Sequence, residues 1–257
     1  MVTVTVEGLS VALGKRTVVR DASFTVSPGT LTGIVGPNGA GKSTLARAML
    51  ALVSAQGRVL VDDADAATMP RAELARRIAY LPQGQTLHWP LTVERLVGLG
   101  RLPHLAPMSR LGEADAAAIE RAMDRADVLP LRHRIATELS GGERARVLLA
   151  RALAVEAPAL IADEPLASLD PGHQIDVMEL LGEEARAGRT VVAVLHDLTM
   201  AARYCDRIIL IDGGRIVADG APGVVLTADN LRAVYGIEVR IEEHDGRPAI
   251  VPLGRSR

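Results

Sequence analysis

The sequence predicts an α/β protein built on a largely parallel sheet, and three observations support this fold class. Near-continuous aliphatic runs recur along the chain, as is typical of parallel strands that are covered on both faces. A stretch of helical apolar spacing interrupts them at about 83–154. A glycine-rich loop at 36–44 follows one aliphatic run and precedes a helix. We therefore predict one domain, with a core at 1–82 and 155–257 and an inserted helical subdomain at about 83–154.

Short, half-buried strands are predicted at the start of the chain. Val2–Val6 and Ser23–Val26 alternate apolar and polar residues with a period of two. Leu31–Val35 is an aliphatic strand that leads into the glycine-rich loop, and a helix is expected over Lys42–Leu52. Arg58–Asp62 is expected to pair at the edge. These opening strands predict an antiparallel β layer at the edge of the core.

The later elements follow the same two patterns. The predicted helices of the insertion, which prolines separate, are Val93–Leu99, Glu113–Ala126 and Gly142–Leu153. The predicted core strands are Ala159–Ala162, Thr190–Leu195 and Arg207–Asp212. A turn at 212–214 and a second one at Asp245-Gly246 predict a small C-terminal β layer, with strands at Arg215–Ala218, Ile237–Glu242 and Ala249–Pro252.

The loop at 36–44 fills every fixed position of the phosphate-binding pattern G-x-x-x-x-G-K-[ST]. Its residues are Gly36, Pro37, Asn38, Gly39, Ala40, Gly41, Lys42, Ser43 and Thr44. Glycines allow successive backbone amides to surround phosphate oxygens, and the following helix directs its N-terminal amides at the same anion. Lys42 is expected to reach the terminal phosphates and Ser43 to ligate Mg²⁺. The loop therefore predicts a nucleoside triphosphate site.

Two further strand ends carry residues suited to the same chemistry. Asp163 and Glu164 end one aliphatic run, where Asp163 is expected to share Mg²⁺ with Ser43 and Glu164 to be the base for water. His196 ends the next run and is expected to contact the γ-phosphate, because parallel strands present their carboxyl ends to one crevice. In isolation, such acids favour a cap or a turn and such a histidine a loop role. The nearby phosphate loop favours the functional interpretation.

A second anion-binding helix end is predicted at Leu139–Glu143. Ser140 is expected to cap the helix, and Gly141 and Gly142 leave backbone amides accessible. The alternative is an ordinary capped helix after a glycine turn, and the spacing alone does not decide between the two.

Composition limits the partners. The net charge is −2 and aromatic residues make up 2% of the chain, so no nucleic-acid partner is expected. No apolar run approaches the roughly 20 residues that span a bilayer, so a membrane role requires a partner protein. The single cysteine, Cys205, is typical of a cytosolic protein.

Together these motifs resemble the nucleotide-binding subunit of ATP-binding cassette (ABC) transporters, over essentially the whole chain. The LSGG sequence at 139–142 precedes the acidic strand, as it does in that family. The resemblance implies a P-loop NTPase (RecA-like) core. It also implies that Gln83 senses Mg²⁺ and the attacking water, that Ser168 and Asp170 belong to the D-loop, and that His196 is the switch histidine.

The family arrangement implies a homodimer that binds ATP between its subunits. The phosphate loop of one copy would face Ser140, Gly141, Gly142 and Glu143 of the other, and closure would drive an integral membrane permease supplied by a substrate-binding protein. This implies a peripheral position on the cytoplasmic face of the inner membrane. Two positions depart from the family pattern. Leu13 replaces the aromatic residue that stacks on adenine, and Glu143 replaces a glutamine.

Two segments, His88–Val93 and Leu99–His104, look like those of importers for iron siderophores, haem or cobalamin. Zinc and manganese importers share a similar tryptophan-proline stretch and are the first alternative. The second is a soluble ABC protein that acts on ribosomes or nucleic acid. Such proteins usually carry two cassettes or a long coiled-coil insertion, which this sequence does not show.

Overall fold

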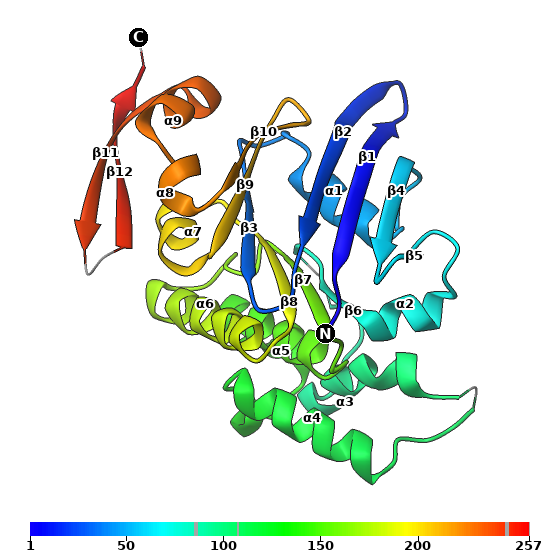
Figure 1. Cartoon of the computed structure of the whole chain (residues 1–257). Helices are drawn as coiled ribbons and strands as arrows, with labels where there is room; N and C mark the ends of the chain where they lie inside the picture. The colour runs from blue at the N-terminus through cyan, green and yellow to red at the C-terminus, as the bar shows by residue number, and fades with distance from the viewer. Residues whose placement is uncertain (85–86, 107, 245–246, 257) are drawn as a thin grey trace.

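The computed structural model describes residues 1–84, 87–106, 108–244 and 247–256, and its centre is a six-stranded sheet (Figure 1). The strand order is β10-β9-β3-β8-β7-β6. These strands are β3 (Leu31–Val35), β6 (Ile78–Leu81), β7 (Ala159–Asp163), β8 (Thr190–Val194), β9 (Arg207–Asp212) and β10 (Arg215–Gly220). All neighbouring pairs are parallel except β9 and β10. The predicted α/β class and parallel sheet are confirmed.

The predicted antiparallel edge layer is also confirmed. It is a four-stranded sheet in the order β2-β1-β4-β5, comprising β1 (Val4–Leu13), β2 (Arg16–Val26), β4 (Gln56–Val61) and β5 (Ala64–Asp65). β1 and β2 are longer than predicted, because register shifts after Val6, Leu9 and Val11 interrupt the alternation on which the prediction relied.

Helices cover both faces of the central sheet (Figure 1). They are α1 (Lys42–Met49), α2 (Arg71–Arg77), α3 (Val93–Gly98), α4 (Glu113–Arg125), α5 (Gly141–Leu153), α6 (Pro171–Arg186), α7 (Leu198–Tyr204), α8 (Pro222–Val225) and α9 (Ala228–Tyr235). Short 3-10 helices occupy Leu99–His104, Leu129–Leu131 and Ala136–Glu138. α1 packs between the two sheets in one apolar core, and α3 to α7 contribute to the other. None of the described helices is long and apolar enough to cross a membrane.

Helices α3, α4 and α5 pack against one another in the predicted helical stretch (Figure 1). The division of the chain near residues 82 and 154 remains a prediction. A buried charge joins this stretch to the core: Glu184 of α6 is fully buried and forms ion pairs with Arg125 of α4 and with Arg189. A charge buried this deeply is stable only when it is paired.

The C-terminal β layer is a two-stranded hairpin, β11 (Ile237–His244) and β12 (Arg247–Arg255), beside α7 and α9 (Figure 1). The strand predicted at Arg215–Ala218 is not part of this layer, because it lies in β10, which pairs with β9 at the edge of the central sheet. The Thr199 hydroxyl of α7 donates to the Ile250 carbonyl at 3.0 Å and accepts from the Ile250 amide at 3.2 Å. The predicted Asp245-Gly246 turn lies outside the described residues.

Candidate active site

The phosphate loop leaves the carboxyl end of β3 and enters α1. At Gly36, with φ 157°, a Cβ atom would lie 2.1 Å from the Ile211 carbonyl oxygen. At Gly41, with φ 105°, it would lie 2.7 Å from the Val18 carbonyl oxygen. Both positions therefore require glycine. No side chain caps the start of α1, so its first amides remain available to a ligand.

Lys42 lies inside this loop with its side chain buried. Its Nζ donates to the carbonyl oxygens of Gly36, at 2.7 Å, and Pro37, at 3.0 Å. Burial lowers the pKa of Lys42, and the negative charges of Glu164 and Asp163 oppose that shift. The ammonium group is thus held among loop carbonyls, next to the space that the loop amides surround.

Asp163, at the end of β7, is almost completely buried and has two hydroxyl partners. Ser43 Oγ donates to its Oδ1 at 2.9 Å, and the Tyr80 hydroxyl donates to its Oδ2 at 3.3 Å. Burial raises the pKa of this carboxyl group, chiefly by removing it from water. A carboxylate beside a hydroxyl oxygen is a ligand set that suits Mg²⁺. The donor chemistry of Ser43 and Asp163 therefore fits this ion.

Glu164 is held by residues from the ends of the two strands that flank β7. Gln83, just after β6, donates from Nε2 to Glu164 Oε2 at 2.6 Å, and His196, just after β8, contacts Oε1 through Nε2. Glu164 has φ 55°, which is a strained backbone conformation for a residue with a side chain. The strain and the two contacts together fix the direction of its carboxylate.

A cleft of about 680 Å³ brings together nine of the predicted residues. Its lining comprises Val18, Asn38, Gly39, Gly41, Lys42, Ser43, Thr44, Gln83, Glu164 and His196. Such a volume is typical of a small-molecule site. Sequence reasoning missed Val18 and Tyr80. Nothing in the sequence distinguishes Val18 from its strand neighbours, whereas Tyr80 is one of few aromatic residues and stands three positions before Gln83.

Other predicted site residues lie outside this lining. Leu13 is half exposed at the end of β1, and its proposed contact with the base stays a prediction. Gly141 lies beside Ser168, since a Cβ atom on Gly141 would be 3.3 Å from Ser168 Cβ. Asp170 caps α6 by accepting from the His173 amide at 3.1 Å, and it also contacts the His173 ring. Asp170 thus has a structural role within one chain.

The predicted cap at the start of α5 is present, and Glu143 is part of it. Ser140 Oγ accepts from the Glu143 amide at 3.3 Å, while Glu143 Oε2 accepts from the Ser140 amide at 2.9 Å. Arg134 donates to the other carboxylate oxygen at 2.7 Å. The Ser140 amide is the main reason that the pKa of Glu143 is lowered. A glutamate at this position therefore gains an ion pair that a glutamine would lack.

Comparisons with known proteins agree with this geometry. A family model described as ABC transporter matches residues 19–167. A cobalamin import ATP-binding protein, BtuD of Halobacterium salinarum, is 44% identical over 256 residues, which are 98% of this chain, and the chain spans 64% of that relative's length. A hemin import ATP-binding protein, HmuV of Pseudomonas aeruginosa, is 42% identical over 254 residues, covering 96% of this chain and 98% of the relative.

Solved structures show the same fold. An inward-facing metal-chelate type ABC transporter aligns with a TM-score of 0.84 and 26% identity, over 98% of this chain and 97% of the other. An ATP-binding cassette of an ABC transporter in its ADP conformation aligns with a TM-score of 0.81 and 26% identity, over 91% of this chain and 98% of the other.

Proposed function

The chain belongs to the ABC transporter family and binds ATP, and on this premise we propose that it is the ATP-hydrolysing subunit of an importer for metal chelates. The similar proteins named for cobalamin and hemin import, and the transporter of metal-chelate type, support this substrate class. An iron siderophore, haem or cobalamin is the expected cargo. The observation that carries the proposal is the fixed Glu164 carboxylate beside the phosphate loop.

In this proposal Glu164 is the general base. Its carboxylate would accept a proton from the water that attacks the γ-phosphorus of ATP. Gln83 and His196 would keep the carboxylate directed at that water, since each contacts one of its oxygens. Lys42 would exchange its two loop carbonyls for phosphate oxygens when ATP binds.

Mg²⁺ is the expected cofactor, and Ser43, Asp163 and Gln83 would hold it. The Gln83 amide nitrogen is occupied by Glu164, which leaves its Oε1 as the oxygen available to an ion. When bound, Mg²⁺ neutralises charge that develops on the phosphates. Ser43 and Asp163 already hydrogen-bond to each other, so their oxygens lie close enough together to share one ligand.

A second copy of the chain would complete the nucleotide site. The cleft around the phosphate loop is lined by none of Ser140, Gly141 and Gly142 of the same chain. We propose that these residues, with Glu143, meet ATP across a homodimer interface, and that Ser168 and Asp170 lie at the same interface. The N-terminal end of α5 would then contribute its dipole to the triphosphate of the partner.

The permease is expected to dock on the segment around Trp89. This side chain is 74% exposed and Leu102, in the 3-10 helix at Leu99–His104, is 59% exposed. Large apolar side chains that remain in contact with water are typical of protein interaction sites. In this proposal the chain is peripheral, on the cytoplasmic face of the membrane, and the permease receives cargo from a substrate-binding protein.

Co-purification tests the function. Tagged Glu164→Gln protein would be isolated from native membranes with Mg²⁺ and ATP, and the proteins bound to it identified by mass spectrometry. We expect a permease, and loss of that permease from a Glu164→Gln, Trp89→Ala double variant that still binds ATP. A Lys42→Ala variant serves as the control without nucleotide.

The identity of the partner separates the alternatives. A permease whose binding protein takes a chelate supports the proposal, whereas one that takes bare zinc or manganese would replace the cargo class. Ribosomes or nucleic acid without a permease would instead indicate the soluble type of ABC protein.

A further inference from the structure

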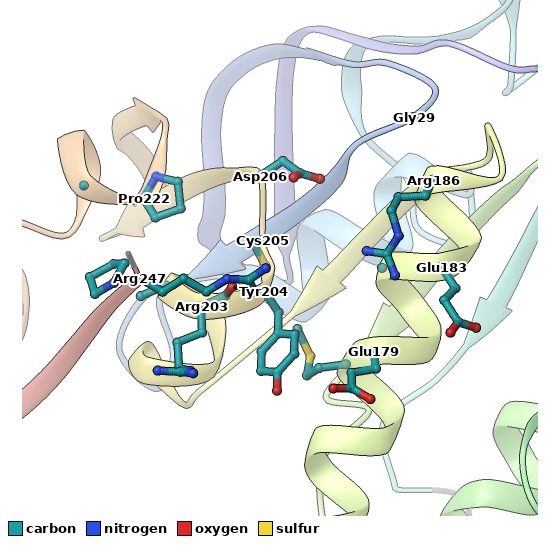
Figure 2. A pocket seen from close by; sticks show the side chains of 15 residues that line it. Gly29, Glu179, Glu183, Arg186, Arg203, Tyr204, Cys205, Asp206, Pro222 and Arg247 are labelled. Atoms are coloured by element: carbon teal, nitrogen blue, oxygen red, sulfur yellow. Dashed lines mark hydrogen bonds between the residues drawn. The ribbon is translucent and has the colours of Figure 1, made fainter. Parts of the chain in front are cut away.

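A second cavity, of about 710 Å³, lies between α6, α7 and the C-terminal segments (Figure 2). It shares no lining residue with the nucleotide cleft. Its walls are formed by one face of α6, by the end of α7 and the residues after it, and by the first residues of α8 and β12. The cavity therefore joins the core to the C-terminal hairpin.

Two guanidinium groups extend into this cavity from opposite walls. Figure 2 shows Arg186 reaching in from α6 and Arg247 reaching in from the start of β12. Like charges that face each other across a cavity repel, unless an anion lies between them. In the described part of the chain Glu183 and Glu184 of α6 pair with Arg125 and Arg189, and neither Arg186 nor Arg247 has a carboxylate partner within ion-pair distance.

Arg247 is held by contacts with its neighbours, and Arg186 lies along its own helix. Arg247 Nη1 donates to the Arg203 carbonyl, and the guanidinium carbon lies 5.9 Å from the centre of the Tyr204 ring. Arg186 lies against Gly182, where a Cβ atom would be 3.1 Å from Arg186 Nη1. A glycine weakens a helix interior, and here it leaves room for the guanidinium group.

Three acidic residues also line the cavity, and among the described residues no ion pair joins any of them to Arg186 or Arg247. Asp206 Oδ2 already accepts from the Leu31 amide at 2.8 Å. Glu183 is directed toward Arg125, at 3.8 Å. Glu179 lines the same cavity from α6 (Figure 2), and its carboxylate is an acceptor for a hydroxyl group.

From this arrangement we propose that the cavity binds a phosphate group between Arg186 and Arg247, either as inorganic phosphate or on a small hydroxyl-bearing molecule. Guanidinium groups match the oxygens of phosphate with paired hydrogen bonds. The volume exceeds the needs of a free ion, and Glu179 provides an acceptor for a hydroxyl of the organic part. Binding would fasten the C-terminal hairpin to α6.

Calorimetric titration of the Lys42→Ala protein tests this site, because that background removes phosphate binding at the phosphate loop. Inorganic phosphate and glycerol 3-phosphate are each titrated at constant ionic strength. We expect one site per chain, weakened at least about tenfold by Arg186→Gln or Arg247→Gln. Tighter binding of glycerol 3-phosphate would identify an organic phosphate as the ligand, and equal binding would identify the free ion.

Arg203→Gln is the matched control, because Figure 2 shows this arginine lining the same cavity and directed away from Arg186. It should bind phosphate as the parent does. Hydrogen exchange provides a second readout: phosphate should slow the exchange of β12 amides in the parent and not in Arg247→Gln. The absence of binding in the Lys42→Ala protein would overturn the proposal, and so would an equal loss in all three arginine variants.

Discussion

Two helices of this protein begin beside glycine-rich loops, and their N-terminal ends differ in how their amides are satisfied. Gly41 is the N-cap residue of α1 and offers no side-chain cap, whereas Ser140 is the N-cap residue of α5 and forms a cap that Glu143 completes. The end of α1 is thus open to a ligand within its own chain. The end of α5 is already stabilised by its own residues, so a ligand there competes with an internal cap.

The carboxyl groups near the two helix ends also differ, in the direction in which folding shifts their pKa. Burial raises the pKa of Asp163 near the open end, whereas hydrogen bonds lower the pKa of Glu143 at the capped end. A carboxylate with a raised pKa destabilises the fold at neutral pH, and one with a lowered pKa stabilises it. In the ligand-free protein at neutral pH, the carboxylate of Asp163 near the open end therefore destabilises the fold, and the carboxylate of Glu143 at the capped end stabilises it.

The largest effect is expected from Glu164→Gln, next to the open end. An amide cannot accept the proton of water, so steady-state hydrolysis should fall by at least about 100-fold while ATP affinity stays near that of wild type. Phosphate release and equilibrium titration measure the two quantities. Glu143→Gln makes the same chemical change at the capped end and should retain most of the turnover. Comparable losses in both variants would remove the distinction between the ends.

The next effect concerns the geometry of the open end. Gly41→Ala places a Cβ atom against the Val18 carbonyl, whereas nothing lies within 4 Å of a Cβ atom on Gly39, where φ is 80°. Gly39→Ala and Gly41→Ala both strain the backbone, but only Gly41→Ala adds a clash. The ATP affinity of Gly41→Ala should therefore be at least about tenfold lower than that of Gly39→Ala. Titration with a fluorescent ATP analogue measures this, with the unfolding midpoint as control. Equal affinities would mean that the close approach to Val18 is unimportant.

A smaller effect is expected from Asp163→Asn, measured by urea unfolding of the ligand-free protein. The pKa of Asp163 is raised on folding. The destabilisation caused by its buried charge is therefore absent below the ordinary carboxyl pKa and develops as the pH rises through the pKa of the folded state. The asparagine variant should therefore be more stable than wild type by about 1 kcal/mol at pH 7, with no gain below about pH 4. A less stable variant at pH 7 would mean that the Ser43 and Tyr80 hydrogen bonds outweigh burial.

The smallest effect is expected from Glu143→Gln on unfolding at the capped end. The pKa of Glu143 is lowered on folding. The stabilisation that its charge gives to the fold is therefore present above the ordinary carboxyl pKa and is lost as the pH falls through the pKa of the folded state. Its ion pair with Arg134 is partly exposed, so the variant should lose less than about 1 kcal/mol at pH 7. Glu138→Gln makes the same chemical change nearby and serves as the control. A loss that persists at acid pH would contradict the electrostatic explanation.

The phosphate loop and the open end of α1 were predicted from the sequence more completely than the elements around Glu164. The order of β3, loop and α1 follows from local residues, and the helix cap at Ser140 has a local signal as well. The four residues of β6 carry no clear pattern, and α6 went unpredicted although Asp170-Pro171 is a good helix start. Gln83 and Glu164 are 81 positions apart in sequence, so only the family resemblance linked them. Val18 reaches the cleft through sheet packing, which no local pattern encodes.

The position of β3 has a consequence for the time at which this protein first becomes able to bind ATP. β3 pairs with β8 on one side and β9 on the other, although both follow it by more than 150 residues. Because translation proceeds from the N-terminus, the phosphate loop leaves the ribosome long before the strands that support it. The nascent chain therefore carries an unsupported loop until β9 has emerged. Nucleotide binding is thus a late event that reports near-complete synthesis of the chain.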